Sequence, residues 1–413
     1  MIKFDRFTLP NGLKVIFHKD TTTPLAVVNT LYDVGARDED PLKTGFAHLF
    51  EHLMFGGSKN IPDFDSPLQN AGGESNAFTS NDITNYYDIV PAQNIETALW
   101  LESDRMLSLA FTEKSLETQR NVVIEEFKQR YLNQPYGEVW LKLRPLAYEK
   151  HPYQWATIGK EIKHIEDATM DDVKSFFKKH YTPSNAILCI AGNFELSEIK
   201  RLVTKWYGDI PGGIKPARIL PLEPRQEIYK ELEIESHVPS DAFYYAFKMP
   251  ERKSIGYYIA DLLSDALGSD KSSRLYLKIQ KEAKLVTEIN AYITGSIDHG
   301  LLVIEGKLSV GVQFEELDLA LWEVLKTLTS FELDEVELER LKNKIRTIKE
   351  FGEQGMLNRA MNLCLYELLG DANGVNEEEL IYKQINTEIL LETAKEIFIK
   401  ENCSLLKVNA THS

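Results

Sequence analysis

Cysteine is scarce in this sequence. Three cysteines occur in 413 residues, and Cys189, Cys364 and Cys403 are odd in number, far apart and set among apolar residues. A small secreted protein held together by disulfides would have an even set of closely spaced cysteines. We therefore predict three reduced thiols in the protein core and no disulfide framework.

Long hydrophobic runs are also absent. No stretch reaches the roughly 18 apolar residues that a membrane-spanning helix needs, so we expect no membrane span and no membrane partner. The first seven residues, from Met1 to Phe7, contain neither the basic region nor the apolar region of a secretory signal peptide. These absences favour a cytoplasmic location, or a periplasmic one if a leader segment has been removed.

Positive charge is in deficit. The chain has 47 Lys and Arg residues against 63 Asp and Glu residues, which gives a formal net charge of −16. A duplex phosphate backbone would repel such a chain, so nucleic acid is excluded as an expected partner. The acidic surface could favour basic peptides, but a solvated surface that keeps the protein soluble is the simpler interpretation.

The length and the order of the predicted elements indicate two similar domains. A chain of 413 residues exceeds one ordinary domain and suggests two of about 200 residues each. An Asn-Gly turn within residues 7–17 predicts a hairpin, and a strand is expected near 25–34. A helix at 173–181 runs into a buried strand at 185–193, and the same order recurs at 394–402 and 403–410. This repeat predicts homologous domains at 1–212 and 227–413, joined by a Pro- and Gly-containing linker at 213–226.

The most informative segment is His48-Leu49-Phe50-Glu51-His52. Two histidines four residues apart on a helix project from one face, so both rings can reach one ion at the roughly 2.0–2.1 Å of a Zn–N bond. Glu51 lies beside them as a candidate general base for a zinc-activated water. The order H-x-x-E-H is that of the inverzincins and predicts a zinc hydrolase, in the first place a peptidase.

The surroundings of this segment favour a metal site over two ordinary histidines. Residues 45–55 are apolar nearly all round, which predicts a buried helix in which polar side chains need partners. When the second half is aligned on its Gly-Ser-Asp-Lys segment, Ala260, Leu263 and Ser264 stand where His48, Glu51 and His52 stand in the first. The second half has therefore lost the ligands, and we expect one zinc ion per chain.

A catalytic zinc site normally has three protein ligands and one open position. A helix predicted at 115–133 offers two adjacent candidates for the third ligand, Glu125 and Glu126. The helical phase of the neighbouring valines does not separate them.

The chain resembles the pitrilysin/insulysin family of zinc peptidases, and most closely its short branch, which includes the mitochondrial processing peptidase subunits and their bacterial relatives. The resemblance rests on H-x-x-E-H, on an F-x-L-x-N-G-L opening at residues 7–13 and on the segment Gly72-Gly73-Glu74-Ser75-Asn76-Ala77-Phe78-Thr79. Family members have a glutamate 74–77 residues after the motif, and Glu126 lies 74 residues after His52. The resemblance thus implies Glu126 as the third ligand.

The family fold implies an α+β protein of two homologous α/β domains, each a mainly antiparallel sheet flanked by helices, which together form half of a clamshell. In the family the strand after the Gly-Gly pair binds the substrate backbone as an added strand, which implies Asn76, Ala77 and Phe78 as peptide-binding residues. Family members commonly have Glu seven residues before the third ligand, next to the metal shell. This chain has Gln119 there.

A second departure from the family concerns an Arg/Tyr pair that long members use to bind substrate. Gln280 and Thr287 occupy the corresponding places here, and the nearby Arg274 and Tyr276 match a structural segment of the family. We therefore expect a homologous partner subunit to supply the pair, in a heterodimer, or a homodimer in isolation.

The function predicted from the sequence is zinc-dependent endopeptidase activity on unfolded peptides inside a two-subunit chamber. The alternatives are a non-proteolytic assembly subunit of the same family and a different zinc hydrolase on the same fold.

Overall fold

The structure is a computed structural model that describes residues 1–330 and 333–411. The chain divides into two compact units. Unit 1 contains residues 1–128, 155–220 and 349–377, whereas unit 2 contains residues 129–154, 221–348 and the stretch from Glu378 to the C-terminus. Each unit therefore draws on both halves of the sequence.

Unit 1 is built on a six-stranded sheet with the strand order β1-β2-β6-β3-β5-β4. Its strands are β1 (Asp5–Thr8), β2 (Lys14–Lys19), β3 (Leu25–Tyr32), β4 (Glu74–Thr79), β5 (Thr84–Pro91) and β6 (Ala186–Gly192). All neighbouring strands are antiparallel except β2 and β6, which are parallel. The central strands β3 and β6 are almost entirely buried, and β4 is an edge strand paired on one side only.

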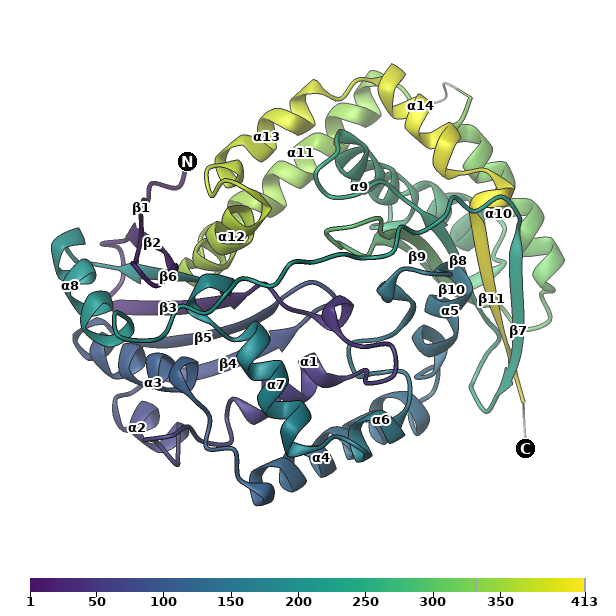
Figure 1. Ribbon diagram of the computed structural model, residues 1–413. Coiled ribbons are helices and arrows are strands. Elements are labelled where there is room, and N and C mark those ends of the chain that lie inside the picture. The colour runs from purple at the N-terminus through teal and green to yellow at the C-terminus, as the bar shows by residue number, and fades with distance from the viewer. Residues whose placement is uncertain (331–332, 412–413) are drawn as a thin grey trace. The chain divides into compact units, whose positions relative to one another are not determined.

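Helices cover both faces of this sheet. They are α1 (Phe46–Leu53), α2 (Asp65–Asn70), α3 (Ile95–Leu107), α4 (Glu113–Phe127), α6 (Ile162–Glu166), α7 (Met170–His180), α8 (Leu196–Tyr207) and α12 (Met356–Leu369). Side chains alternate along a strand, so Val27 and Leu31 of β3 pack against α12, while Thr30 points to the opposite face and donates to Glu102 of α3. Figure 1 shows α12 on one side of the sheet and α1 and α3 on the other.

Unit 2 repeats the same design. Its five-stranded sheet has the order β7-β11-β8-β10-β9, with β7 (Lys230–Ser236), β8 (Ala242–Lys248), β9 (Val286–Ile293), β10 (Leu301–Leu308) and β11 (Cys403–Ala410). Only β7 and β11 are parallel. The order matches β2-β6-β3-β5-β4 of unit 1, strand for strand. The prediction of two similar domains with mainly antiparallel sheets is confirmed.

The remaining helices complete unit 2. They are α5 (Val139–Ala147), α9 (Ile255–Gly268), α10 (Phe314–Leu328) and α14 (Thr387–Ile397), together with α11 (Glu335–Gly352) and α13 (Gly374–Gln384), which cross a unit boundary. A π-helical turn, η3 (Lys128–Leu132), follows α4, and a second, η6 (Tyr276–Glu282), precedes β9.

Two helices pack on the sheet of the opposite half of the sequence. Leu363 and Cys364 of α12 join a buried cluster with Val27 and Cys189 of unit 1. In the same way α5 packs its buried face on β8 and β11 of unit 2. The apolar pattern of a helix does not indicate which sheet it will cover. The placement of α5 and α12 could therefore not be predicted from the sequence. The boundaries 1–212, 213–226 and 227–413 remain a prediction about the repeat.

Several local predictions are confirmed. β1 and β2 form the expected hairpin, and Gly12 in its turn has the positive φ (+90°) that glycine tolerates best. The strands expected near 25–34, 185–193 and 403–410 are β3, β6 and β11. All three cysteines are buried and none forms a disulfide. No helix in the described ranges has both the length and the apolar character that a membrane span requires.

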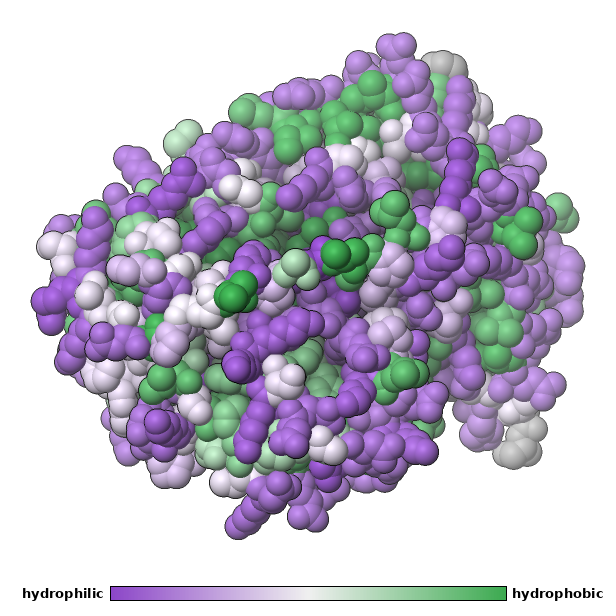
Figure 2. Space-filling view, viewed as in Figure 1, coloured by the Kyte–Doolittle hydropathy of each residue, from purple (hydrophilic) through white to green (hydrophobic). Residues whose placement is uncertain are grey.

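The visible face of the molecule is largely polar. Figure 2 shows mostly hydrophilic residues with hydrophobic ones in separate patches. No helix or strand occurs between Tyr207 and Lys230, the stretch that contains the predicted linker. Ile214, Ile219 and Leu222 in this stretch are largely exposed.

Candidate metal centre

The helix α1 has an apolar side and a polar side. Its apolar residues (Phe46, Ala47, Leu49, Phe50 and Leu53) are buried. His48, Glu51 and His52 are only partly buried, and because residues three and four apart share a helix face, the three project together. The expectation that the helix is buried nearly all round is therefore wrong for this side, because these three polar residues turn away from the core.

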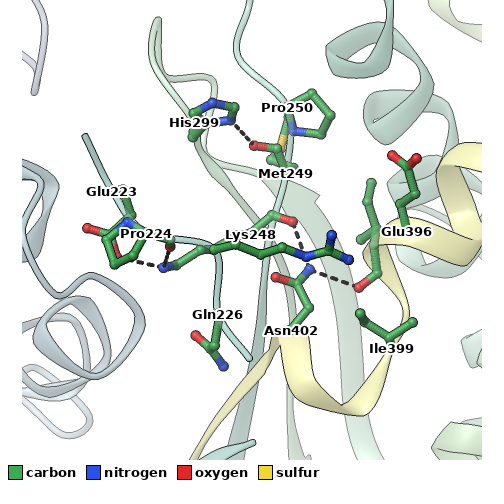
Figure 3. Close-up of a pocket in the computed structure, with 12 residues that line it drawn as sticks. Glu223, Pro224, Gln226, Lys248, Met249, Pro250, His299, Glu396, Ile399 and Asn402 are labelled. Carbon is green, nitrogen blue, oxygen red and sulfur yellow. Dashed lines mark hydrogen bonds and ion pairs between the residues drawn. The ribbon is translucent and has the colours of Figure 1, made fainter. Parts of the chain in front are cut away.

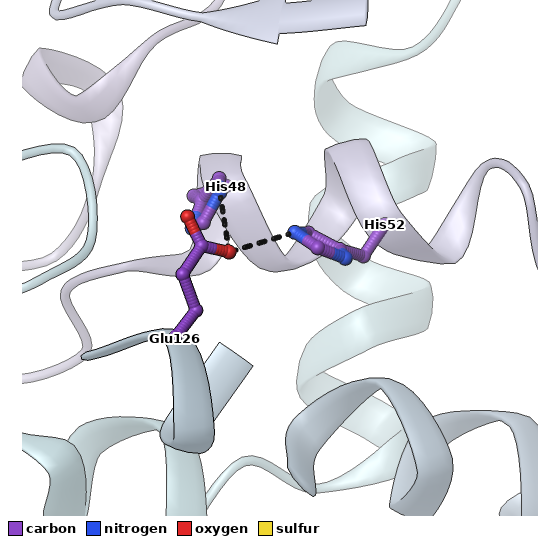
Figure 4. Close-up of side chains that lie close together, drawn as sticks. All are labelled: His48, His52 and Glu126. Carbon is purple, nitrogen blue, oxygen red and sulfur yellow. Dashed lines mark ion pairs between the residues drawn. The ribbon is translucent and has the colours of Figure 1, made fainter. Parts of the chain in front are cut away.

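Glu126 of α4 completes a cluster with the two histidines. Its Oε2 lies 3.6 Å from Nε2 of His48 and 3.4 Å from Nε2 of His52. One ligand atom from each residue lies within 4.8 Å of the others. Figure 4 shows both rings projecting from α1 toward the carboxylate that α4 presents.

These distances fit a single zinc ion. Two ligand atoms about 2.05 Å from one ion, at a tetrahedral angle, lie roughly 3.4 Å apart. Two nitrogens and one carboxylate oxygen are also a usual donor set for catalytic zinc. Zinc can therefore be held here without large movement of the backbone.

The structure shows which of the two adjacent glutamates of α4 faces the histidines. Glu125 is exposed and pairs with Lys128 at 2.7 Å, so it lies on the solvent side of α4. Glu126, one residue further, turns about 100° around the helix and faces His48 and His52. Gln119 lies two turns before Glu126 and is partly buried. Its predicted role beside the metal shell remains a prediction.

Glu51 is held by the edge strand. Thr79, the last residue of β4, donates its hydroxyl to Oε2 of Glu51 at 2.6 Å. Two buried tyrosines, Tyr86 and Tyr181, lie close enough for the Glu51 carboxylate to add to the effect of burial in raising their pKa values. Both phenols therefore stay neutral near Glu51. Sequence reasoning quoted Thr79 within its segment but gave it no role.

The edge strand β4 carries the three predicted peptide-binding residues. Asn76, Ala77 and Phe78 pair with Tyr87, Tyr86 and Asn85 of β5, and no other strand in the described residues pairs with β4. Asn76 and Phe78 are exposed. The strand is thus available for pairing with an added peptide, although the role of these residues remains a prediction.

Glu39 fixes the start of α1, and sequence reasoning missed it. Gly45 at the N-cap has no side chain that could cap the helix. The buried Glu39 carboxylate instead accepts the backbone N–H groups of Gly45 and Ala47, each at 2.9 Å, and the indole N–H of Trp155 at 3.0 Å. Burial raises the pKa of Glu39 from 4.5 to about 8, although these donors act to lower it.

We expect Glu39→Gln to remove one component of the pH dependence of stability. Between pH 4.5 and about 8 the folded chain keeps a proton on Glu39 that the unfolded chain has lost. The free energy of unfolding therefore falls as pH rises through this window, by up to about 1.4 kcal/mol per pH unit. Glutamine carries no such proton. The stability of the variant relative to the wild type should therefore increase as pH rises from 5 to 8. Urea unfolding across this range measures the difference.

The control for this prediction is Glu166→Gln, which changes an exposed acid at the end of α6. Its stability should stay parallel to that of the wild type at every pH. A constant offset between Glu39→Gln and the wild type would show that Glu39 titrates normally.

The positions of the expected Arg/Tyr pair contact each other. Gln280 of η6 donates its amide to the backbone oxygen of Thr287 in β9 at 2.6 Å. The nearby Arg274 forms a bidentate ion pair with Glu337 and donates to the hydroxyl of Thr327. Neither Gln280 nor Thr287 supplies a cation.

Two family models match the chain in succession. Residues 14–159 match the insulinase domain of peptidase family M16, and residues 167–345 match the peptidase M16 inactive domain. The first match contains the His-His-Glu cluster and Glu51. The chain belongs to peptidase family M16.

Two named relatives are similar over most or nearly all of the chain. The zinc protease PqqE of Helicobacter pylori is 28% identical over 402 residues, which cover 96% of this chain and 90% of that protein. The beta subunit of the mitochondrial-processing peptidase of Saccharomyces cerevisiae is 26% identical over 312 residues, which cover 71% of this chain and 66% of that subunit. The resemblance to zinc peptidases is confirmed, and Zn²⁺ is the cofactor that the family implies.

Solved structures support the fold. A protease from Helicobacter pylori has a TM-score of 0.92 at 26% identity and covers 99% of this chain and 100% of its own. The periplasmic protease PqqL from Escherichia coli has a TM-score of 0.81 at 19% identity, and the match spans 99% of this chain but 48% of PqqL. One chain of this M16 protein therefore corresponds in fold to about half of that longer protease.

Proposed function

We propose that this protein is a zinc-dependent endopeptidase that hydrolyses unfolded peptides or short polypeptides. The observation that carries the proposal is the convergence of His48, His52 and Glu126 beside Glu51, with carboxylate–imidazole distances of 3.4 and 3.6 Å. An assembly subunit without activity would have no need for this arrangement. The insulinase-type match over the same residues adds support.

Each residue has a defined task in the proposed reaction. His48, His52 and Glu126 would hold a zinc ion, which would supply the Lewis-acid activation of the attacking water and of the substrate carbonyl. Glu51 takes the proton from the attacking water and delivers it to the leaving amine. The hydroxyl of Thr79 keeps the Glu51 carboxylate in one orientation.

The edge strand supports a choice of substrate. A peptide added beside β4 forms main-chain hydrogen bonds that are independent of its sequence. Thr79 at the end of this strand contacts Glu51, so a peptide paired with Asn76, Ala77 and Phe78 runs toward the general base. A folded protein cannot present an extended backbone there, which favours unfolded substrates.

A partner subunit is the second part of the proposal. This chain matches 48% of PqqL, and Gln280 and Thr287 stand where long relatives have the Arg/Tyr pair. We place the pair on a homologous partner, which makes this chain the zinc-bearing subunit of a heterodimer. The predicted cytoplasmic location remains a prediction, since a structural relative is named periplasmic.

We expect the isolated chain to cleave unstructured peptides about 10²–10³-fold more slowly than the chain co-expressed with a neighbouring homologous subunit. The isolated chain lacks the Arg/Tyr pair, which would stabilise the negative charge that develops on the substrate carbonyl oxygen. The measurement is kcat/KM on a peptide library, with size analysis of each preparation. Arginine and tyrosine in the partner are then replaced in turn. Full activity from a pure monomer would contradict the two-subunit part of the proposal and leave the zinc chemistry standing.

A further inference from the structure

Unit 2 contains a cavity of about 370 Å³, built from residues that have no part in the metal cluster of unit 1. It lies where four segments meet: residues 223–226 before β7, residues 248–250 at the end of β8, His299 in the β9–β10 turn, and residues 396–402 between α14 and β11 (Figure 3). Its volume is in the range of about 300–1,000 Å³ that small-ligand pockets have.

The walls of this cavity are fixed by their own hydrogen bonds. Glu223 pairs with Lys248 at 2.6 Å and accepts the backbone N–H groups of residues 149, 150 and 151. Burial alone would raise the pKa of Glu223, but these donors lower it to about 2. Asn402 donates to the backbone oxygens of Lys248 and Ile397, each at 2.9 Å. Lys248 is therefore neutralised, and the cavity is formed in advance.

Arg225 is the cation that stays available. It lines the cavity and is exposed, and the described residues place no carboxylate within ion-pair distance of it. Apolar side chains from Met249, Pro250 and Ile399 line the cavity beside it. A guanidinium next to an apolar wall suits a carboxylate attached to an apolar group.

The equivalent place in unit 1, just before β6, is occupied by an extended segment of the chain itself. There Asn185 donates to the backbone oxygens of Asp33 and His180, just as Asn402 does to its two acceptors. The residues that follow His180 bind the chain's own extended segment, because Ser184 donates its backbone N–H to the oxygen of Gly212. An ion pair between Arg218 and Asp33 anchors the same segment. In unit 2 the equivalent residues, Ile399 and Asn402, line the open cavity instead.

We propose that this cavity binds an extended peptide segment, with a carboxylate of the peptide on Arg225 and an apolar side chain against Met249 and Ile399. The segment takes the place that residues 212–218 take in unit 1, with the charges reversed, because Arg225 belongs to the site and the carboxylate to the ligand. This is a second peptide site, separate from β4 and independent of zinc.

The test uses methionine methyl groups as reporters. The chain has seven methionines, and Met249 lines the cavity, whereas Met54 follows the metal-bearing helix. With ¹³C-methyl-labelled methionine, and Met249→Leu to assign the signal, the full-length protein is titrated with N-acetyl-Leu-Leu. The Met249 signal should move in a saturable way while the Met54 signal stays. Zinc and peptide cleavage are not needed, so the result is separate from the proposed hydrolysis.

Two comparisons isolate the carboxylate. The C-terminal amide of the same dipeptide should bind at least tenfold more weakly, and so should the free acid to Arg225→Glu. The matched control is Arg201→Glu, which changes an exposed arginine on α8 and should leave the affinity unchanged. A Met249 signal that does not move, equal affinity for acid and amide, or an unaffected Arg225→Glu would each overturn the proposal.

Discussion

Glu51→Gln is expected to slow peptide hydrolysis by about 10²–10⁴-fold, the contribution of a positioned general base. Glutamine has the same shape and can still accept the hydroxyl of Thr79, which lies 2.6 Å from the carboxylate. It cannot take a proton from water. The expected loss is therefore in kcat, with zinc content and thermal stability unchanged. A fluorogenic unstructured peptide, metal analysis and a melting curve measure the three quantities.

Glu117→Gln is the matched control, because Glu117 is an exposed acid on α4 that lies outside the cluster. It should cleave peptides like the wild type. Cleavage that is unchanged in Glu51→Gln would exclude the proposed mechanism. A wild-type complex that binds zinc and cleaves no peptide would favour the assembly subunit or a hydrolase of another class.

Much of the fold could be predicted because each local pattern agreed with the tertiary structure. The Asn-Gly turn gave the β1–β2 hairpin, and the repeated helix-then-strand order gave the two matching sheets. The placement of α5 and α12 on the sheet of the opposite half of the sequence could not be predicted, because an apolar helix face does not show which sheet it will cover. Pairing over more than 300 residues, as between Cys364 and Asn29, leaves no local trace in the sequence.

Part of the candidate metal cluster could be predicted because one helix brings His48 and His52 together by spacing alone. Glu39 was not, because an acid seven residues before a helix caps it only if the loop folds back, which no local pattern encodes. The Thr79–Glu51 contact likewise depends on where β4 lies beside α1. Helical phase could not choose between Glu125 and Glu126, and there the family spacing was needed.

Glu126→Gln is expected to weaken zinc binding by more than 100-fold. Removing a residue of the outer shell commonly costs about 10–100-fold, and Glu126 is a direct ligand in the proposed site. Glutamine removes the negative charge that balances the ion and leaves a weaker oxygen donor. Competition with a chromophoric chelator measures the affinity without any assay of cleavage, and circular dichroism checks that α4 is intact.

Glu125→Gln supplies the matched control on the same turn of the same helix. Its carboxylate pairs with Lys128 on the solvent side, and exposed pairs contribute about 0–1 kcal/mol to stability. Zinc affinity should therefore stay within about twofold of the wild type. The reverse outcome, weak zinc binding in Glu125→Gln and normal binding in Glu126→Gln, would mean that α4 is rotated by one residue in the zinc-bound protein. Because the two variants differ only in which side of α4 loses its charge, the comparison tests the orientation of the helix on which the whole site depends.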